Sequence, residues 1–178
     1  MKKLTTSCDA TIRWRAFELR PAGSPPLPPE YRARIEAGRP RLKALARDQY
    51  GVELNPGPFG INSRTALVGA KYAEAQGLGP AYHEAVFAAY WQHARAIDDP
   101  QVLATIASEV GLDPAAFVAA LDNSTFQDAV SADIAEAQAY GLTGVPAHIF
   151  NGRYLVVGAQ PYDVLQRICA QLAAEDPA

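Results

Sequence analysis

The chain has 178 residues, of which 49% are hydrophobic and 20% charged, which is enough for one globular domain with a substantial core or for a domain that carries an insertion. Its formal net charge of −3, without a long basic run, argues against nucleic acid or an anionic membrane as a partner. No stretch approaches the roughly 18 uninterrupted apolar residues of a membrane span, and no apolar segment follows Lys2 and Lys3, so we expect a cytoplasmic protein.

The cysteines and histidines predict neither a metal site nor a cofactor. Cys8 and Cys169 lie near opposite ends of the sequence and form no C-x-x-C pair, and the three histidines, His83, His93 and His148, are scattered. The sequence therefore offers no catalytic residue of its own.

The N-terminal segment predicts a strand followed by a stiff linker. In Thr11–Leu19, apolar Ile12 and Trp14 alternate with arginines before the phase changes, which is typical of a strand with a bulge or an early end. The segment Gly23–Pro29 is rich in proline and predicts an extended connection.

The sequence from Tyr31 to Tyr140 predicts helices almost throughout. Three helix starts have recognisable N-caps: Asp99 before Pro100, Asp113 before Pro114, and Ser124 with Gln127 as a capping box. The basic segment from Arg32 to Lys43 fits one face of a solvated helix. Apolar residues recur at helical spacing, which indicates core faces: Val86, Phe87, Tyr90, Trp91, Ala94, Ile97, Leu103, Ile106, Ala107, Val110, Phe117, Val118 and Leu121.

A β-hairpin is predicted after the helices. Asn151-Gly152 separates the apolar runs Ala147–Phe150 and Tyr154–Val157, and both central residues of a type I′ turn need positive φ. Val145-Pro146 lies where a loop enters the first strand, because proline cannot donate to a sheet ladder. Such a loop could present unpaired backbone groups to an extended partner chain, although a plain strand-entry proline is the commoner interpretation.

A last helix is predicted from Pro161, and it closes a chain of two parts. Its apolar face holds Val164, Leu165, Ile168, Cys169 and Leu172. Cys169 on that face is interpreted as a small hydrophobic residue rather than a nucleophile. The order of elements predicts one domain formed by residues 1–30 and 141–178, with residues 31–140 as an inserted helical subdomain.

The sequence resembles the DsbA-like proteins of the thioredoxin superfamily, specifically their FrnE-like branch. The resemblance covers nearly the whole chain and rests on "IRWRAFELRP" (Ile12–Pro21), "NSRTALVGAKYAEAQG" (Asn62–Gly77), "VFAAYWQHARAIDDPQVLATIASEVGLD" (Val86–Asp113) and "GVPAHIFNGRYLVVGAQP" (Gly144–Pro161). It implies an α/β, thioredoxin-like fold, incomplete at the N-terminus, with a large all-helical insertion. It also implies a cis bond at Val145-Pro146 and a substrate-binding loop at Gly144, Val145 and Pro146.

The sequence also departs from the pattern of this family at its N-terminus. Family members begin with a strand and a C-x-x-C at a helix N-terminus, whose dipole activates the attacking thiolate. We expect this chain to lack that strand, the motif and most of the first helix, and Cys8 to be an incidental surface or loop cysteine. Either the natural start lies upstream of Met1, which we favour, or the protein has lost its redox element and kept the groove. We therefore expect an incomplete sheet with exposed edges. Either a second copy of the chain in a homodimer or a shift of Thr11–Leu19 against Ala147–Phe150 would cover these edges.

The sequence is compatible with three alternative functions. The first is a thiol-disulfide oxidoreductase or isomerase that acts on a protein or peptide thiol or disulfide, inactive in the chain as given. The second is a non-catalytic peptide-binding or chaperone-like module. The third is a glutathione-dependent isomerase or transferase similar to the 2-hydroxychromene-2-carboxylate isomerases, in which Asn62-Ser63 resembles a ligand-contacting element. For that pair a helix N-cap is the commoner role.

Overall fold

A computed structural model describes residues 2–8 and 10–175. The chain divides into two compact units, one formed by Met1–Leu19 with Asp133–Ala178 and the other by Arg20–Ala132. None of the described helices is long and apolar enough to cross a lipid bilayer.

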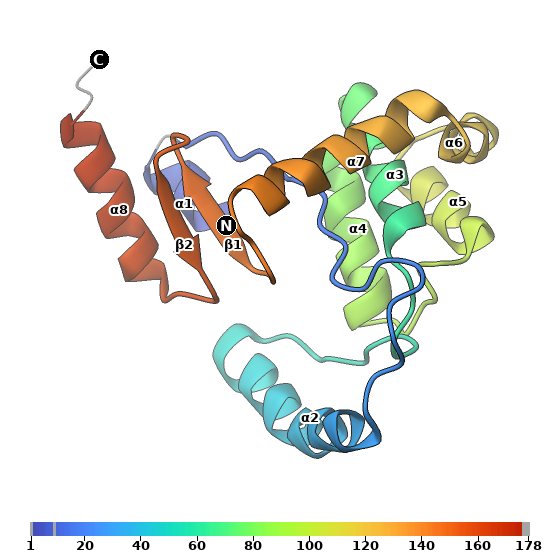
Figure 1. Cartoon of the computed structure of the whole chain (residues 1–178), viewed down its shortest axis with the longest axis horizontal. Coiled ribbons are helices and arrows are strands. Elements are labelled where there is room, and N and C mark those ends of the chain that lie inside the picture. The colour runs from blue at the N-terminus through green and yellow to red at the C-terminus, as the bar shows by residue number, and fades with distance from the viewer. Residues whose placement is uncertain (1, 9, 176–178) are drawn as a thin grey trace. The chain divides into compact units, whose positions relative to one another are not determined.

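The second unit is helical, as the sequence predicts. Its elements are α2 (Pro29–Tyr50), α3 (Arg64–Ala75), α4 (Gly79–Trp91), α5 (Pro100–Glu109), α6 (Pro114–Leu121) and the first part of α7 (Ser124–Ala139). Helices α3 to α6 pack together (Figure 1) around fully buried Tyr82, Leu103, Ile106 and Phe117. By contrast, α2 buries none of its side chains, which confirms the solvated helix predicted around Arg32–Lys43.

Two of the three predicted N-caps are confirmed. The carboxylates of Asp99 and Asp113 accept hydrogen bonds from the backbone N–H groups of Gln101, at 2.8 Å, and Ala116, at 2.7 Å. The predicted capping box at Ser124 is wrong, because α7 is capped one residue earlier, where Asn123 Oδ1 accepts from the Thr125 N–H at 2.9 Å. The amide of Gln127 donates instead to the Leu121 carbonyl.

The first unit contains helix α1 (Lys2–Ser7), a hairpin of strands β1 (Ala147–Phe150) and β2 (Tyr154–Val157), and helix α8 (Tyr162–Glu175). The strands are antiparallel, and Ala147 faces Val157 while Phe150 faces Tyr154. Asn151 and Gly152 have φ values of 47° and 68°, so the turn that the sequence predicts is confirmed. Helix α8 buries Leu165 and Leu172, as its apolar face predicts.

The sheet is incomplete in the described part of the chain, where β1 and β2 pair only with each other. The strand predicted at Thr11–Leu19 is wrong: this segment has no ladder partner, and it does not shift against Ala147–Phe150. A backbone that cannot pair in a sheet needs other acceptors when it is buried.

One carboxylate provides such an acceptor. Asp133 on α7 is only 4% exposed, and its Oδ2 accepts a hydrogen bond from the buried Ala16 N–H at 2.7 Å. Its Oδ1 lies 3.1 Å from Nη1 of Arg15, whose Nε also lies 3.4 Å from the exposed Glu136. The segment around Ala16 is therefore attached to α7 by a side chain rather than by a β-ladder.

We expect Asp133→Ala to destabilise the first unit by about 1–3 kcal/mol, because the buried Ala16 N–H loses its acceptor. Urea unfolding followed by the fluorescence of Trp14 tests this in a Trp91→Phe background, since the chain has two tryptophans and Trp14 belongs to this unit. Glu136→Gln is the matched control, and its exposed ion pair should contribute below about 1 kcal/mol. Equal effects of the two substitutions would contradict this role of Asp133.

Candidate functional site

The predicted substrate-binding loop begins where helix α7 ends. Gly141 has a φ of 69°, its N–H donates to the Gln138 carbonyl at 2.9 Å, and the Leu142 N–H donates to the Ala137 carbonyl at 3.0 Å. This is a Schellman motif, in which a left-handed residue closes the helix and satisfies its last carbonyls. The chain therefore leaves α7 in a defined direction before it reaches Gly144.

The loop is also attached at its other end. The Val145-Pro146 bond is cis, the isomer that the family resemblance implies, and the Pro146 carbonyl accepts a hydrogen bond from the Gly158 N–H at 2.8 Å. The expectation that the loop carbonyls face outward is therefore wrong for Pro146, because the hairpin places the end of β2 opposite it. One hydrogen bond thus connects the residue before β1 to the residue after β2.

The backbone ahead of Pro146 remains open. Val145 is 56% exposed, and within residues 2–8 and 10–175 its N–H and C=O make no hydrogen bond. A β-carbon added at Gly144 would meet no atom within 4 Å, so this residue also borders free space. An extended peptide could pair with these groups as an additional strand.

Apolar side chains lie beside the open backbone on one face of the hairpin. The cross-strand partners Ile149 and Leu155 share this face with Val157, and all three are exposed. The opposite face carries His148 and Phe150, whose rings lie 6.5 Å apart, and the buried His148 Nδ1 has no hydrogen-bond partner among the described residues. The open backbone and the apolar face together suit an extended polypeptide.

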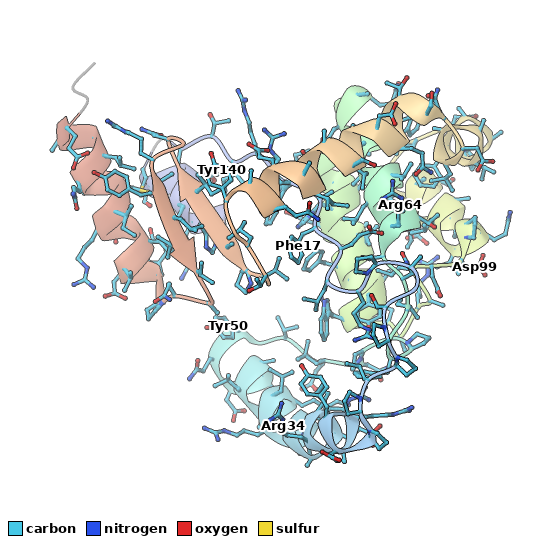
Figure 2. The ribbon with its side chains drawn as sticks, viewed as in Figure 1. Phe17, Arg34, Tyr50, Arg64, Asp99 and Tyr140 are labelled. Carbon is cyan, nitrogen blue, oxygen red and sulfur yellow. The ribbon has the colours of Figure 1, made fainter. Side chains whose placement is uncertain are left out.

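Asn62 has a structural task in the second unit, whereas Gly144, Val145 and Pro146 belong to the first. Its Oδ1 accepts a hydrogen bond from the Arg64 N–H at 2.7 Å at the start of α3, while Ser63 makes no side-chain cap bond. Arg64, which is labelled in Figure 2, in turn reaches α7, where its Nη2 donates to Ser131 Oγ at 2.9 Å. Capping, the commoner role for Asn62-Ser63, therefore falls to Asn62, and its ligand contact remains a prediction.

Both cysteines belong to the first unit. Both side chains are half-buried, and Cys8 Sγ lies 3.4 Å from Ser7 Oγ. Burial raises the pKa of the Cys169 thiol, and the neighbouring Cys8 thiol raises it further. Cys8 directly follows α1, and its role as an incidental surface or loop cysteine stays a prediction.

Metal ligands are not clustered in the part of the chain that the structure describes, where no three His, Cys, Asp or Glu side chains could hold an ion.

Comparison with known proteins identifies the family. Residues 1–170 match the DSBA-like thioredoxin domain. The chain belongs to the DsbA-like thioredoxin family. It is 32% identical over 166 residues to the uncharacterized protein YwbO of Bacillus subtilis (strain 168), an alignment that covers 89% of this chain and 80% of that protein. The fold class that the sequence predicts is therefore confirmed.

Three solved structures resemble this DsbA-like chain. The probable DsbA oxidoreductase SCO1869 from Streptomyces coelicolor is 26% identical with a TM-score of 0.77, over 92% of this chain and 76% of that one. A 2-hydroxychromene-2-carboxylate isomerase is also 26% identical, with a TM-score of 0.78, over 98% of this chain and 89% of that one. A disulfide isomerase-like protein from Nitrosomonas europaea, at 17% identity and a TM-score of 0.71, shows the fold alone.

We expect Val145→Pro to weaken binding of an extended polypeptide roughly 3- to 10-fold, because it removes one backbone donor from the open edge. Val145→Ala is the matched control, since it removes the valine side chain but keeps the N–H, and it should bind more tightly than Val145→Pro. Fluorescence anisotropy with labelled, carboxymethylated insulin B chain measures the affinity. If the two variants bind equally well, the backbone of Val145 does not pair with the peptide.

Proposed function

We propose that this chain is a thiol-disulfide oxidoreductase or isomerase family protein of the FrnE-like branch, whose Gly144–Pro146 loop binds a protein or peptide substrate in the cytoplasm. The observation that carries the proposal is the open backbone of Val145 beside the Val145-Pro146 bond, at a loop attached at both ends. Membership of the DsbA-like family and the likeness to a probable DsbA oxidoreductase support it.

The proposed role separates substrate binding from chemistry. Exchange between a dithiol and a disulfide needs an attacking thiolate and a resolving thiol that releases the mixed disulfide. In its relatives' usual form these thiols stand in a C-x-x-C motif at a helix N-terminus, and the 178 residues hold no such motif. We therefore propose that the 178-residue chain binds an extended polypeptide without turning it over.

The 178-residue protein should not reduce insulin above the uncatalysed rate in the presence of dithiothreitol. Turbidity of the precipitating B chain measures the reaction, beside a version extended in frame to any upstream C-x-x-C. Activity confined to the extended version supports a working oxidoreductase. Turnover by the short version that disappears on Cys8→Ser would overturn the proposal, whereas peptide binding without turnover by either version would favour a chaperone-like module.

A second candidate is a glutathione-dependent isomerase or transferase. It rests on the likeness to a 2-hydroxychromene-2-carboxylate isomerase, which spans 98% of this chain at 26% identity. Asn62 is the residue that we propose to contact glutathione in that case. Its Oδ1 is engaged by the Arg64 N–H, so the amide Nδ2 is the group left to donate to a ligand carboxylate.

For this candidate, Asn62→Asp should keep the cap of α3 and weaken glutathione binding about tenfold, since a carboxylate still accepts the Arg64 N–H but cannot donate and repels an anion. Isothermal titration with S-methylglutathione measures the affinity without thiol chemistry. Absence of binding by the parent chain, or equal binding by the variant, excludes Asn62 from this role.

A further inference from the structure

Helix α2 carries a row of apolar side chains although it buries none of its residues. Tyr31, Leu42 and Leu45 are 41%, 48% and 46% exposed, and Ile35 is half-buried. These four residues form the α2 stripe, and their spacing of four, seven and three positions puts them on one face of the helix. A group of exposed apolar side chains on one face marks a surface that a partner covers.

The α2 stripe has the spacing of a coiled-coil seam. In a heptad lettered a to g, Ile35 and Leu42 take position a, and Tyr31 and Leu45 take position d. Apolar residues at a and d alone form a narrow strip that packs against one other helix, whereas a helix that lies on a domain core carries a broader apolar face. The α2 stripe therefore fits a helical partner.

The two residues of α2 that disfavour a helix leave this seam intact. Pro40 takes position f, which lies furthest from a and d, so its missing N–H faces away from a partner. Gly38 takes the d position between Tyr31 and Leu45, and a β-carbon added there would meet no atom within 4 Å. That free space can receive a large side chain of the partner helix.

Basic side chains line both edges of the α2 stripe. The helix has six basic and three acidic residues, whereas the whole chain has a net charge of −3. The e and g positions, which border a coiled-coil seam, hold Arg32, Arg34, Arg39 and Arg41, and Asp48 is the acidic residue among them. Arg39 and Arg41 form no ion pair within the part of the chain that the structure describes. A complementary partner therefore carries carboxylates beside its own apolar seam.

We propose that α2 is a docking site for an acidic amphipathic helix of another protein. The partner packs its own a and d residues on the α2 stripe and places carboxylates against the flanking arginines, whose planar guanidinium groups suit two hydrogen bonds to a carboxylate. This inference does not depend on the proposed function, because α2 lies in the second unit and the Gly144–Pro146 loop in the first.

Charge and width argue against other occupants of the α2 stripe. A second copy of α2 would bring arginine-lined edges against each other, and like charges that face each other are unfavourable. Helices that lie on a membrane surface carry a broad apolar face that is often rich in tryptophan, phenylalanine and leucine. The α2 stripe is narrow and has two leucines but no tryptophan or phenylalanine. An acidic helix matches both its apolar seam and its basic edges.

The test uses the 178-residue protein and two labelled peptides of three heptads, with isoleucine at a and leucine at d. One peptide has glutamate at e and g, and the other has lysine there. By fluorescence anisotropy, the glutamate peptide should bind about tenfold or more tightly than the lysine peptide, because each flanking arginine meets an opposite charge instead of a like one. The difference should shrink at high salt, which screens exposed charges.

Substitutions on two sides of α2 separate docking from a change in the helix itself. Leu42→Gln with Leu45→Gln should weaken binding of the glutamate peptide about tenfold or more, because two apolar contacts are lost. Ala33→Gln with Ala37→Gln is the matched control away from the stripe, and it should bind as the parent does. Thermal unfolding should be unchanged in both double variants, since α2 buries no side chain. Equal binding by the two double variants overturns the proposal.

Charge reversal tests the edges of the seam. Arg34→Glu with Arg41→Glu should abolish the preference for the glutamate peptide, because both changes border the α2 stripe. Lys43→Glu with Arg47→Glu alters the net charge equally at positions b and f and should keep that preference. A preference that falls equally in both double variants reflects net charge alone and contradicts the assigned seam.

Two further measurements distinguish the other occupants, and both use Leu42→Gln with Leu45→Gln as the variant. A dimer in analytical ultracentrifugation that this variant dissociates would assign the α2 stripe to a second copy of the chain. Binding to phosphatidylserine vesicles that this variant abolishes would assign it to a membrane surface. Either result, or binding of neither peptide by the parent protein, overturns the proposal.

Discussion

The first unit depends on a buried carboxylate that takes the place of a neighbouring strand. The segment around Ala16 has no regular secondary structure, no strand lies beside it among the described residues, and its buried N–H needs an acceptor. Asp133 supplies that acceptor from a helix, and Arg15 balances its charge. Because an unpaired buried charge is strongly unfavourable, the guanidinium and the N–H must be present together for Asp133 to remain buried.

The position of the candidate loop follows from this attachment. Asp133 lies in the part of α7 that leads to the Schellman motif at Gly141, and the loop to Pro146 starts there. At its far end the Pro146 carbonyl is held by Gly158. A binding edge that is fixed at both ends loses little conformational entropy when a peptide pairs with it, which favours binding by pre-organisation. The open backbone of Val145 is therefore a feature of a supported loop rather than of a loose one.

Features that depend on adjacent residues were predicted well, whereas features that depend on distant partners were not. The turn at Asn151-Gly152 and the caps at Asp99 and Asp113 follow from local backbone chemistry, and the structure confirms them. Thr11–Leu19 has the alternation of a strand, but a strand also needs a neighbour, and alternation cannot supply one. The same holds for the candidate site: Val145-Pro146 carries a local signal, whereas the hydrogen bond from the Gly158 N–H to the Pro146 carbonyl joins residues at opposite ends of the hairpin.

The candidate loop and the two cysteines lie on different elements of the first unit. The open backbone is between α7 and β1, while Cys8 follows α1 and Cys169 lies within α8. The hydrogen bonds that hold the loop come from Gly158 and from the end of α7, and none of them involves a cysteine. The loop and the cysteines can therefore be changed by separate substitutions, so that the proposed peptide binding can be tested independently of the thiols.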